Sequence, residues 1–273
     1  MKHFPAFSLD RTSILRLLSL MLAAAVLQAA PALAALDQPA CERLKASRVL
    51  REQAPVGCDR LAVVRFPYVD FSGARHDDGE LMVLGAVAPE VSRLFHALYR
   101  RRFPLARARL IDHYGGDDEA SMRDNNTSAF NQRTVTGGGP PSLHAYGLAI
   151  DINPVQNPFL QPGDTGAVRV SPPAGAAYLN RRASRPGKPP RAGMAEDVIG
   201  LFAKAGFTVW GGDWDTPLDY QHFQFNRELA QRLAALPERE GRQLHLQQIN
   251  AYRACLGEHR IKAGTACAST LAR

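Results

Sequence analysis

Three features are missing from this sequence, and each absence narrows what the protein could be. After the first 34 residues, no apolar run approaches the about 20 residues that a transmembrane helix needs. No two cysteines form a CxxC pair, which disfavours a zinc site built from thiolates alone. The basic residues are mostly dispersed and no aromatic-basic motif of a nucleic-acid-binding module stands out, so a nucleic-acid partner is not expected despite the net charge of +7.

The composition is that of a folded protein. Hydrophobic residues make up 45% of the 273 residues and charged residues 22%, which excludes a disordered or collagen-like chain. The length corresponds to one large domain or two small ones. The excess of 33 basic over 26 acidic residues is compatible with a bacterial envelope as well as with nucleic acid, so charge alone decides nothing.

The N-terminus has the pattern of a signal peptide. An apolar stretch, 17–27, follows three basic residues, Lys2, Arg11 and Arg16. The small-x-small pattern Ala32-Leu33-Ala34 comes shortly after it. We therefore expect residues 1–34 to be a signal peptide, with an uncleaved anchor as the weaker alternative. The protein is expected to be exported, either to the bacterial periplasm or to the medium.

The four cysteines all follow this leader, and an oxidising compartment favours disulfides between them. Four cysteines allow three connectivities. Pairing of Cys41 with Cys58 and of Cys255 with Cys267 is favoured because the partners are close in sequence. Pairing between the two ends of the chain is the alternative.

Hydrophobic patterns predict a mixture of strands and helices without strict alternation, which favours the α+β class. Pro89 is expected to open an amphipathic helix. A second helix is predicted over 194–205. The expected strands are 61–69, 80–85, 105–111, 148–152, 207–210 and 220–225.

Two long polar stretches interrupt these elements, at 113–142 and 153–192, and connections of this length are usually functional or disordered. Residues 226–273 are predicted to be mostly helical. The expected organisation is a peptidase domain at 35–225, including an N-terminal extension, and a C-terminal helical tail at 226–273 that packs on the same domain.

The segment 142–151 (SLHAYGLAID) combines an imidazole, a glycine-containing turn and a carboxylate within an apolar strand. A charged Asp151 is costly there unless it is paired or binds a cation. Zinc accepts imidazole nitrogen and carboxylate oxygen, and a catalytic zinc site needs three protein ligands and a water. His144 and Asp151 are therefore candidate ligands. For Asp151 alone, a carboxylate that caps backbone amides is an equally good interpretation.

The segment 219–223 (DYQHF) supplies a candidate third ligand, His222, between aromatic neighbours. Asp219 lies three positions earlier, where it can serve the same site without being a ligand. Such a carboxylate can take a proton from water and pass it to a leaving amine. From these residues alone, a buried His222 bonded to Asp219 for structural reasons is as good an interpretation.

Together with residues 210–214 (WGGDW), these motifs resemble the zinc D-alanyl-D-alanine carboxypeptidase family. That family includes VanY-type carboxypeptidases, D,D-dipeptidases and L-alanyl-D-glutamate endolysins, and it pairs an SxHxxGxAxD motif with a later D/ExxH motif. The resemblance spans about residues 61–225. It implies a hedgehog/D,D-peptidase-like zinc fold, with a central antiparallel sheet flanked by helices.

The resemblance also implies a zinc site and the residues that form it. One zinc ion per chain would be bound by His144, Asp151 and His222, with Asp219 as the catalytic acid and base. The sequence departs from the family at Gln224, where many relatives carry Glu, so a negative charge is missing near His222.

The family further has an arginine upstream of the first motif that engages the substrate carbonyl or carboxylate. Arg133 is the best match, and Arg123 is the alternative. A guanidinium can stabilise an oxyanion or bind a terminal carboxylate through two parallel hydrogen bonds. Ser142 would orient Arg133 or the substrate.

These expectations describe an exported zinc metallopeptidase that hydrolyses peptidoglycan stem peptides as a D-Ala-D-Ala carboxypeptidase does. One alternative is a cell-wall endopeptidase of the L-alanyl-D-glutamate type. Another is a catalytically inactive zinc-binding protein of the same fold. The expected partner is a peptidoglycan peptide.

Overall fold

The computed structural model describes residues 33–163, 166–182, 184–258 and Cys267. The expected signal peptide, 1–34, lies outside the described residues apart from its last two. Leu33 and Ala34 belong to strand β1 (Leu33–Ala35), which pairs antiparallel with β2 (Leu61–Val69). The described residues from Leu33 onward form one compact unit.

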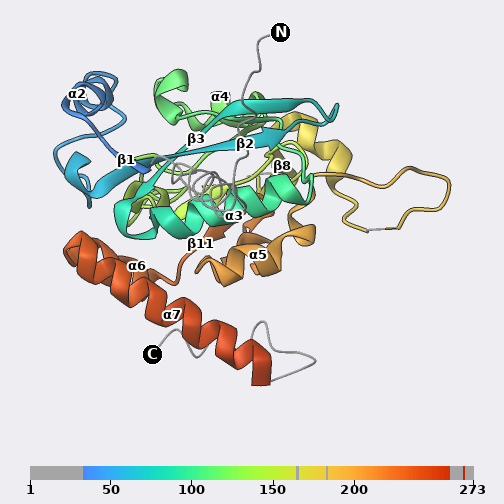
Figure 1. The fold of residues 1–273 in the computed structure, drawn as a ribbon. Helices are drawn as coiled ribbons and strands as arrows, with labels where there is room; N and C mark the ends of the chain where they lie inside the picture. Colours follow the sequence, from blue (N-terminus) through green and yellow to red (C-terminus); the bar gives the residue numbers. More distant parts are fainter. Residues whose placement is uncertain (1–32, 164–165, 183, 259–266, 268–273) are drawn as a thin grey trace, which may run out of the picture. The chain divides into compact units, whose positions relative to one another are not determined.

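A long antiparallel hairpin forms the first sheet, in the order β1-β2-β3 (Figure 1). The predicted strand 61–69 is confirmed in both bounds as β2, and its partner β3 (Arg75–Leu84) begins earlier than predicted. The register shifts between Phe66 and Tyr68. Pro67 lies at this irregularity, where a residue that cannot donate a backbone hydrogen bond is tolerated.

Helix α3 (Ala88–Arg100) packs against β2 and confirms the helix predicted to open at Pro89 (Figure 1). Its buried apolar residues recur with helical spacing, at Val91, Leu94, Phe95 and Leu98. Phe95 connects two parts of the hydrophobic core. Its ring lies 4.3 Å from that of Phe66 in the hairpin and 6.4 Å from that of Phe202.

A second small sheet, in the order β6-β11-β9, contains the two motifs. Its strands are β6 (Ala149–Asp151), β11 (His222–Gln224) and β9 (Val209–Trp210). Phe223 is fully buried and stacks on Phe202 of α5 (Ile199–Lys204) at 4.0 Å. Because successive side chains of a strand alternate between faces, a core-facing Phe223 places His222 and Gln224 together on the other face.

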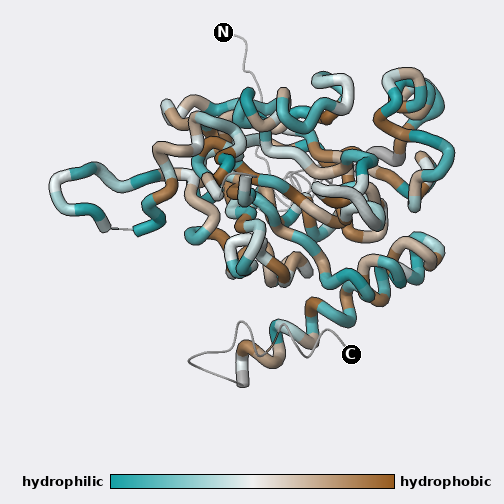
Figure 2. The backbone as a smooth tube through the Cα atoms, turned by 180° about the vertical axis from the view of Figure 1, so that it is seen from behind, coloured by the Kyte–Doolittle hydropathy of each residue, from teal (hydrophilic) through white to brown (hydrophobic). Residues whose placement is uncertain are grey.

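The excursion 153–192 forms a third sheet. Strands β7 (Phe159–Pro162) and β8 (Val168–Ser171) pair as a hairpin, and β7 also pairs with β10 (Leu218–Asp219). Asp219 lies opposite Phe159 in this register. The long polar stretch 153–192 therefore supplies the strand, β7, that pairs with the strand containing Asp219. Beyond this sheet, 180–191 extends away from the rest of the described chain as a hydrophilic loop (Figures 1 and 2).

Two predictions about the sheets need correction. The described strands do not form one central antiparallel sheet but several small ones, including a parallel pair, β4 (Arg107–Ala108) and β5 (Asn126–Thr127). The edge strand expected over 105–111 shrinks to β4, because the chain turns into a 3-10 helix at Ile111. Most of these strands are short and bounded by turns, so they do not join into one sheet. The mixture of helices and strands still agrees with the α+β class.

The helix expected over 194–205 is also interrupted. It begins as the 3-10 helix η7 (Ala195–Asp197), and α5 starts only after Val198, whose φ of −126° is not helical. The polar stretch 113–142 contains helix α4 (Asp118–Arg123). The other 3-10 helices are η2 (Cys58–Arg60), η3 (Gly85–Val87), η4 (Ile111–Tyr114), η5 (Leu143–Tyr146), η6 (Pro173–Tyr178) and η8 (Gly211–Asp213).

The C-terminal region is helical, with α6 (Arg227–Ala235) and α7 (Glu238–Glu258) packed on each other (Figure 1). Helix α7 also contacts η3 and α5. His245 is buried in this contact, where its Nε2 lies 2.9 Å from the carbonyl oxygen of Ala205. Within the described part of the chain, no helix has the length and apolar character needed to cross a membrane.

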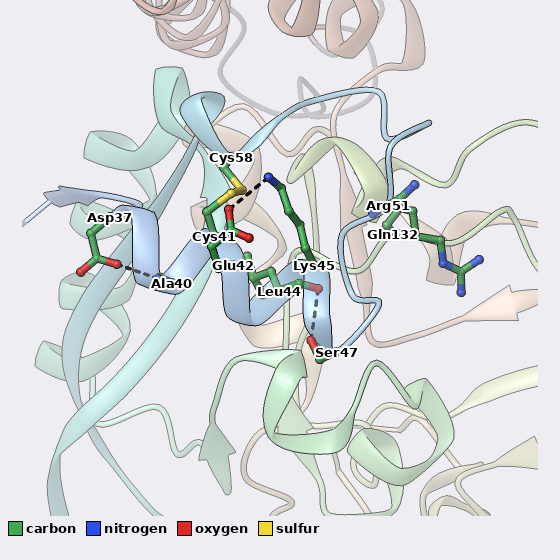
Figure 3. The surroundings of a disulfide bond; sticks show 10 residues. All are labelled: Asp37, Ala40, Cys41, Glu42, Leu44, Lys45, Ser47, Arg51, Cys58 and Gln132. Carbon is green, nitrogen blue, oxygen red and sulfur yellow. Dashed lines mark hydrogen bonds and ion pairs between the residues drawn. A yellow bond between two sulfur atoms is a disulfide. The ribbon is translucent and has the colours of Figure 1, made fainter.

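Both favoured disulfides are present. Cys41 in α2 (Gln38–Ala46) is bonded to Cys58, and Cys255 in α7 is bonded to Cys267. Figure 3 shows the first of them, with the loop that it closes. The backbone N–H of Arg51 in that loop donates to Oε1 of Gln132, next to Arg133. Two disulfides are typical of proteins that fold in an oxidising environment.

Candidate metal centre

The two motifs bring three metal-binding side chains together. His144, Asp151 and His222 are all buried, with exposed fractions of 1%, 3% and 5%. Nε2 of His144 lies 3.1 Å from Oδ2 of Asp151 and 3.1 Å from Nδ1 of His222, which in turn lies 2.9 Å from Oδ1 of Asp151. Ligands about 2 Å from a tetrahedral zinc lie about 3.3 Å apart, so these atoms have nearly the right spacing. The group could hold a metal ion.

Strand register explains how residues so far apart in sequence meet. Asp151 and His222 are directly opposite each other in the β6–β11 pair. His144 reaches them from η5, which ends at Gly147 with a φ of 65°. A Cβ at Gly147 would lie only 2.6 Å from the backbone nitrogen of Leu84. The glycine of the first motif is therefore required both by its backbone conformation and by the close approach to β3.

Both imidazoles are oriented by acceptors outside the cluster. Nδ1 of His144 donates to the carbonyl oxygen of Ala129 at 2.6 Å, and Nε2 of His222 donates to Oε1 of Gln224 at 2.8 Å. In each neutral ring the other nitrogen then carries the lone pair, and that nitrogen faces Asp151. Such outer hydrogen bonds are the usual means by which a protein fixes the tautomer of a metal-binding histidine. The donor set therefore fits a zinc ion.

The electrostatics of the cluster favour a cation. Burial alone would raise the pKa of Asp151, but the adjacent His144 and His222 hold it well below its usual range. Burial opposes a proton on His222, yet the bond to Asp151 raises its pKa above the ordinary value. Asp151 is thus an ionised carboxylate that attracts positive charge, from a proton or from a metal ion.

Asp219 lies in the same site but outside the cluster. Its Oδ1 is buried and has no hydrogen-bond partner among the described residues. Burial, followed by the negative charge of Asp151, raises the pKa of Asp219 to about 7. A carboxyl group with this pKa can both accept and donate a proton near neutral pH.

The WGGDW motif supports the strand that carries Asp219. A Cβ at Gly211 would lie 2.5 Å from the carbonyl oxygen of Asp219, so only glycine permits this approach. Nε1 of Trp210 donates to the carbonyl oxygen of Tyr220 at 2.8 Å. Trp214 approaches the other motif, with its ring 5.3 Å from that of His222.

Arg133 lies beside the cluster, whereas Arg123 does not. A terminal nitrogen of Arg133 lies 3.1 Å from Oδ2 of Asp118, and both side chains are about 70% buried, with exposed fractions of 29% and 28%. Asp118 also accepts from the amide of Asn131. Arg123 instead pairs with Glu119 on the exposed side of α4. The geometry therefore favours Arg133 over Arg123 as the arginine next to the site.

Ser142 has a local structural contact. Its hydroxyl accepts from the backbone N–H of His144 at 3.3 Å and caps η5. Its own backbone N–H donates to the carbonyl oxygen of Arg133 at 3.0 Å. Ser142 thereby connects the backbone of Arg133 to the helix that carries His144.

Two cavities meet at these residues and share Arg133, Thr136, Phe159 and Asp219. The first has a volume of about 130 Å³ and extends toward Glu119 and Arg169. The second has a volume of about 180 Å³ and extends past His222 toward Trp214 and Arg227. The cluster is therefore reached from a divided cleft. A larger hollow of about 840 Å³ beside Cys41 and Cys58 contains none of these residues.

Sequence reasoning missed several residues of the cleft. Gln224 was noted only for a missing charge, although its place two residues after His222 on a strand puts it on the same face. Asp118 and Phe159 come from the two long polar stretches, where no pattern in the sequence pointed to the site. Their positions follow from the folding of α4 and β7.

A comparison with protein families agrees with the motifs. Residues 136–225 match the family described as D-alanyl-D-alanine carboxypeptidase. The match confirms the resemblance and supports a metallopeptidase, and it covers all three residues of the buried cluster as well as Asp219. No curated protein and no solved structure matches the chain.

Proposed function

We propose that this protein is an exported zinc metallopeptidase that hydrolyses peptidoglycan stem peptides, with the activity of a D-Ala-D-Ala carboxypeptidase. The observation that carries the proposal is a buried His-Asp-His group in the same cleft as Asp219, whose Oδ1 has no hydrogen-bond partner among the described residues. The family match over 136–225 supports the same activity.

In this proposal His144, Asp151 and His222 bind the zinc ion. A zinc ion with three protein ligands supplies a Lewis acid that activates a water molecule and polarises the scissile carbonyl. Ala129 and Gln224 keep the two imidazoles in the tautomers that present a lone pair to the ion. The buried Asp151 contributes a negative charge.

Asp219 moves the proton. Its ionised carboxylate takes a proton from the attacking water, and the resulting carboxylic acid gives that proton to the leaving amine. A pKa near neutrality suits both steps, because neither the acid nor the base form then dominates strongly. The unpartnered Oδ1 is free to make these contacts.

Arg133, which lines both halves of the cleft, binds the substrate. Its ion pair with Asp118 engages one edge of the guanidinium and leaves other N–H groups for the substrate. These groups stabilise the negative charge that develops on the carbonyl oxygen. Ser142 helps to orient Arg133 through its backbone bond to that residue.

Export is part of the proposal, because the substrate lies outside the cytoplasm. The signal-peptide pattern of 1–34 and the two disulfides support it. Fractionation of expressing cells tests this directly. The protein is expected in the periplasm or medium, shortened at its N-terminus by about the length of the leader.

The decisive experiment incubates zinc-loaded protein with defined muropeptides and identifies the products by mass spectrometry. Loss of a terminal D-Ala is the expected result. Cleavage within the stem peptide would instead indicate an endopeptidase, and no product from any muropeptide would refute the proposal. The matched control is Asp219→Asn, which is expected to retain zinc and to form no product.

A further inference from the structure

The two halves of the divided cleft differ in how their arginines are paired. In the half that extends toward Glu119, each arginine has an acidic partner: Arg133 pairs with Asp118, and Arg169 pairs with Glu119. The other half contains Arg227, which has no ion pair with a carboxylate among the described residues.

Arg227 is the first residue of α6 and lines the half of the cleft that contains His222, Trp214 and Gln224. Its side chain is half-buried. One terminal nitrogen donates to the carbonyl oxygen of Pro141 at 3.1 Å. Among the described residues, no carboxylate lies within 4.0 Å of its guanidinium. The guanidinium of Arg227 therefore places a positive charge at the edge of the site, and this charge has no acidic partner among the described residues.

We infer that Arg227 binds a carboxylate of the peptide substrate and so determines which side of the scissile bond enters this half of the cleft. The inference rests on the proposed peptidase function and deepens it. A guanidinium held by one backbone carbonyl has a fixed orientation, and its free edge matches a carboxylate through two parallel hydrogen bonds. Arg133 differs from Arg227 in that one of its terminal nitrogens pairs with a carboxylate, that of Asp118.

Two carboxylates of a stem peptide have the required chemistry. One is the C-terminal carboxylate, which a carboxypeptidase must recognise. The other is the free α-carboxylate of a γ-linked D-Glu. Matched peptide pairs distinguish them: a peptide ending in D-Ala-D-Ala is compared with its C-terminal amide, and a peptide containing γ-D-Glu is compared with its isoglutamine form.

The test measures KM and kcat for each pair with the zinc-loaded wild type and Arg227→Gln. For one of the two pairs, the wild type is expected to favour the carboxylate peptide. Arg227→Gln is expected to raise KM for that peptide by about 10- to 100-fold, the range for a charge-assisted hydrogen bond, and to leave the amide unchanged. Arg227→Lys should restore part of the preference. Arg232→Gln, an exposed position on the same helix, is the matched control.

Binding is measured in parallel, so that this inference and the proposed function can fail separately. In an Asp219→Asn background, a change in tryptophan fluorescence, to which Trp214 of the cleft contributes, reports peptide binding without turnover. If Arg227→Gln loses the preference for the carboxylate peptide in binding, the inference is supported, whether or not any peptide is hydrolysed. If no peptide is hydrolysed, only the proposed function fails. An unchanged preference in both pairs overturns the inference, whether or not the protein is a peptidase.

Discussion

Oε1 of Gln224 accepts a hydrogen bond from Nε2 of His222 at 2.8 Å, on the side of the imidazole away from Asp151. The contact assigns the proton of the ring to Nε2 and the lone pair to Nδ1. A neutral amide does this without adding a second negative charge to a site that already contains Asp151 and Asp219. Gln224 is therefore a positioning residue, and the glutamate of many relatives is not needed for that purpose.

Replacement of Gln224 by Met, which keeps the volume but removes the acceptor, is expected to weaken zinc binding by about 10- to 100-fold, as for other outer-shell partners of metal-bound histidines. Gln224→Glu should retain the acceptor and the affinity. Competition with a chromophoric chelator measures both. Equal affinity of the Met variant and the wild type would show that the contact does not orient His222.

Removal of the metal is expected to abolish hydrolysis and to lower the unfolding temperature, and zinc should restore both at one ion per chain. A ligand that binds only the folded state adds about 2.7 kcal/mol of stability at a free concentration of 100 times its Kd. Asp151→Asn should lose this thermal response to zinc. The measurements are elemental analysis and thermal denaturation, and a zinc-independent activity would contradict the metal mechanism.

Asp219 gives a pH dependence with a definite sign. Because its pKa is raised to about 7 in the folded protein, the folded state binds more protons than the unfolded state between the ordinary pKa of an aspartate and about pH 7. The free energy of unfolding therefore falls as the pH rises through this window. Above it, metal-free Asp219→Asn should be more stable than the wild type, by a few kcal/mol at most, since each pKa unit corresponds to about 1.4 kcal/mol.

Chemical denaturation of both metal-free proteins at several pH values measures that difference. It isolates Asp219 because the other titrating groups are common to the two proteins. A constant difference between pH 4 and pH 8 would mean that the carboxyl group has an ordinary pKa. The same substitution should leave zinc affinity within a factor of about three, because Asp219 is not a ligand in the proposed site.

Asp118 is expected to act through Arg133. Asp118→Asn removes the ion pair that holds the guanidinium beside the cleft, and kcat/KM for a stem peptide should fall by about 10-fold, the equivalent of one hydrogen bond to a charged group. Zinc affinity should not change. Arg123→Gln, on the exposed side of the same helix, is the control and should remain fully active. Should Asp118→Asn also be fully active, Arg133 would not depend on this pair.

The sequence was most informative where hydrophobic periodicity and motifs coincide. Strand β2, helix α3 and both disulfides follow the predictions closely, because each depends on local pattern or on nearness in sequence. The side chains of His144, Asp151 and His222 were expected to meet on the basis of a family resemblance. Spacing alone left a structural interpretation open for Asp151 and for His222.

What could not be predicted depends on tertiary pairing. The excursion 153–192 contains no strong strand pattern, and β7 exists because β8 and β10 pair with it on either side. The interruption at Val198 likewise has no signal in an otherwise helical pattern. The position of Asp118 in the site follows from the position of α4 in the fold. An ion pair between separate segments has no characteristic spacing in the sequence, so it could not be predicted.

The register of β6 against β11 has a consequence for folding. Asp151 faces His222 only in one alignment, and a slip by a single residue would turn one of them to the opposite face of the sheet. The unfolded chain, in which these residues are 71 positions apart, presents no comparable binding site. The chain would therefore acquire its capacity to bind the metal late in folding. In a preparation of the protein, the fraction of molecules that bind the metal would equal the fraction in which β6 and β11 pair in the correct register.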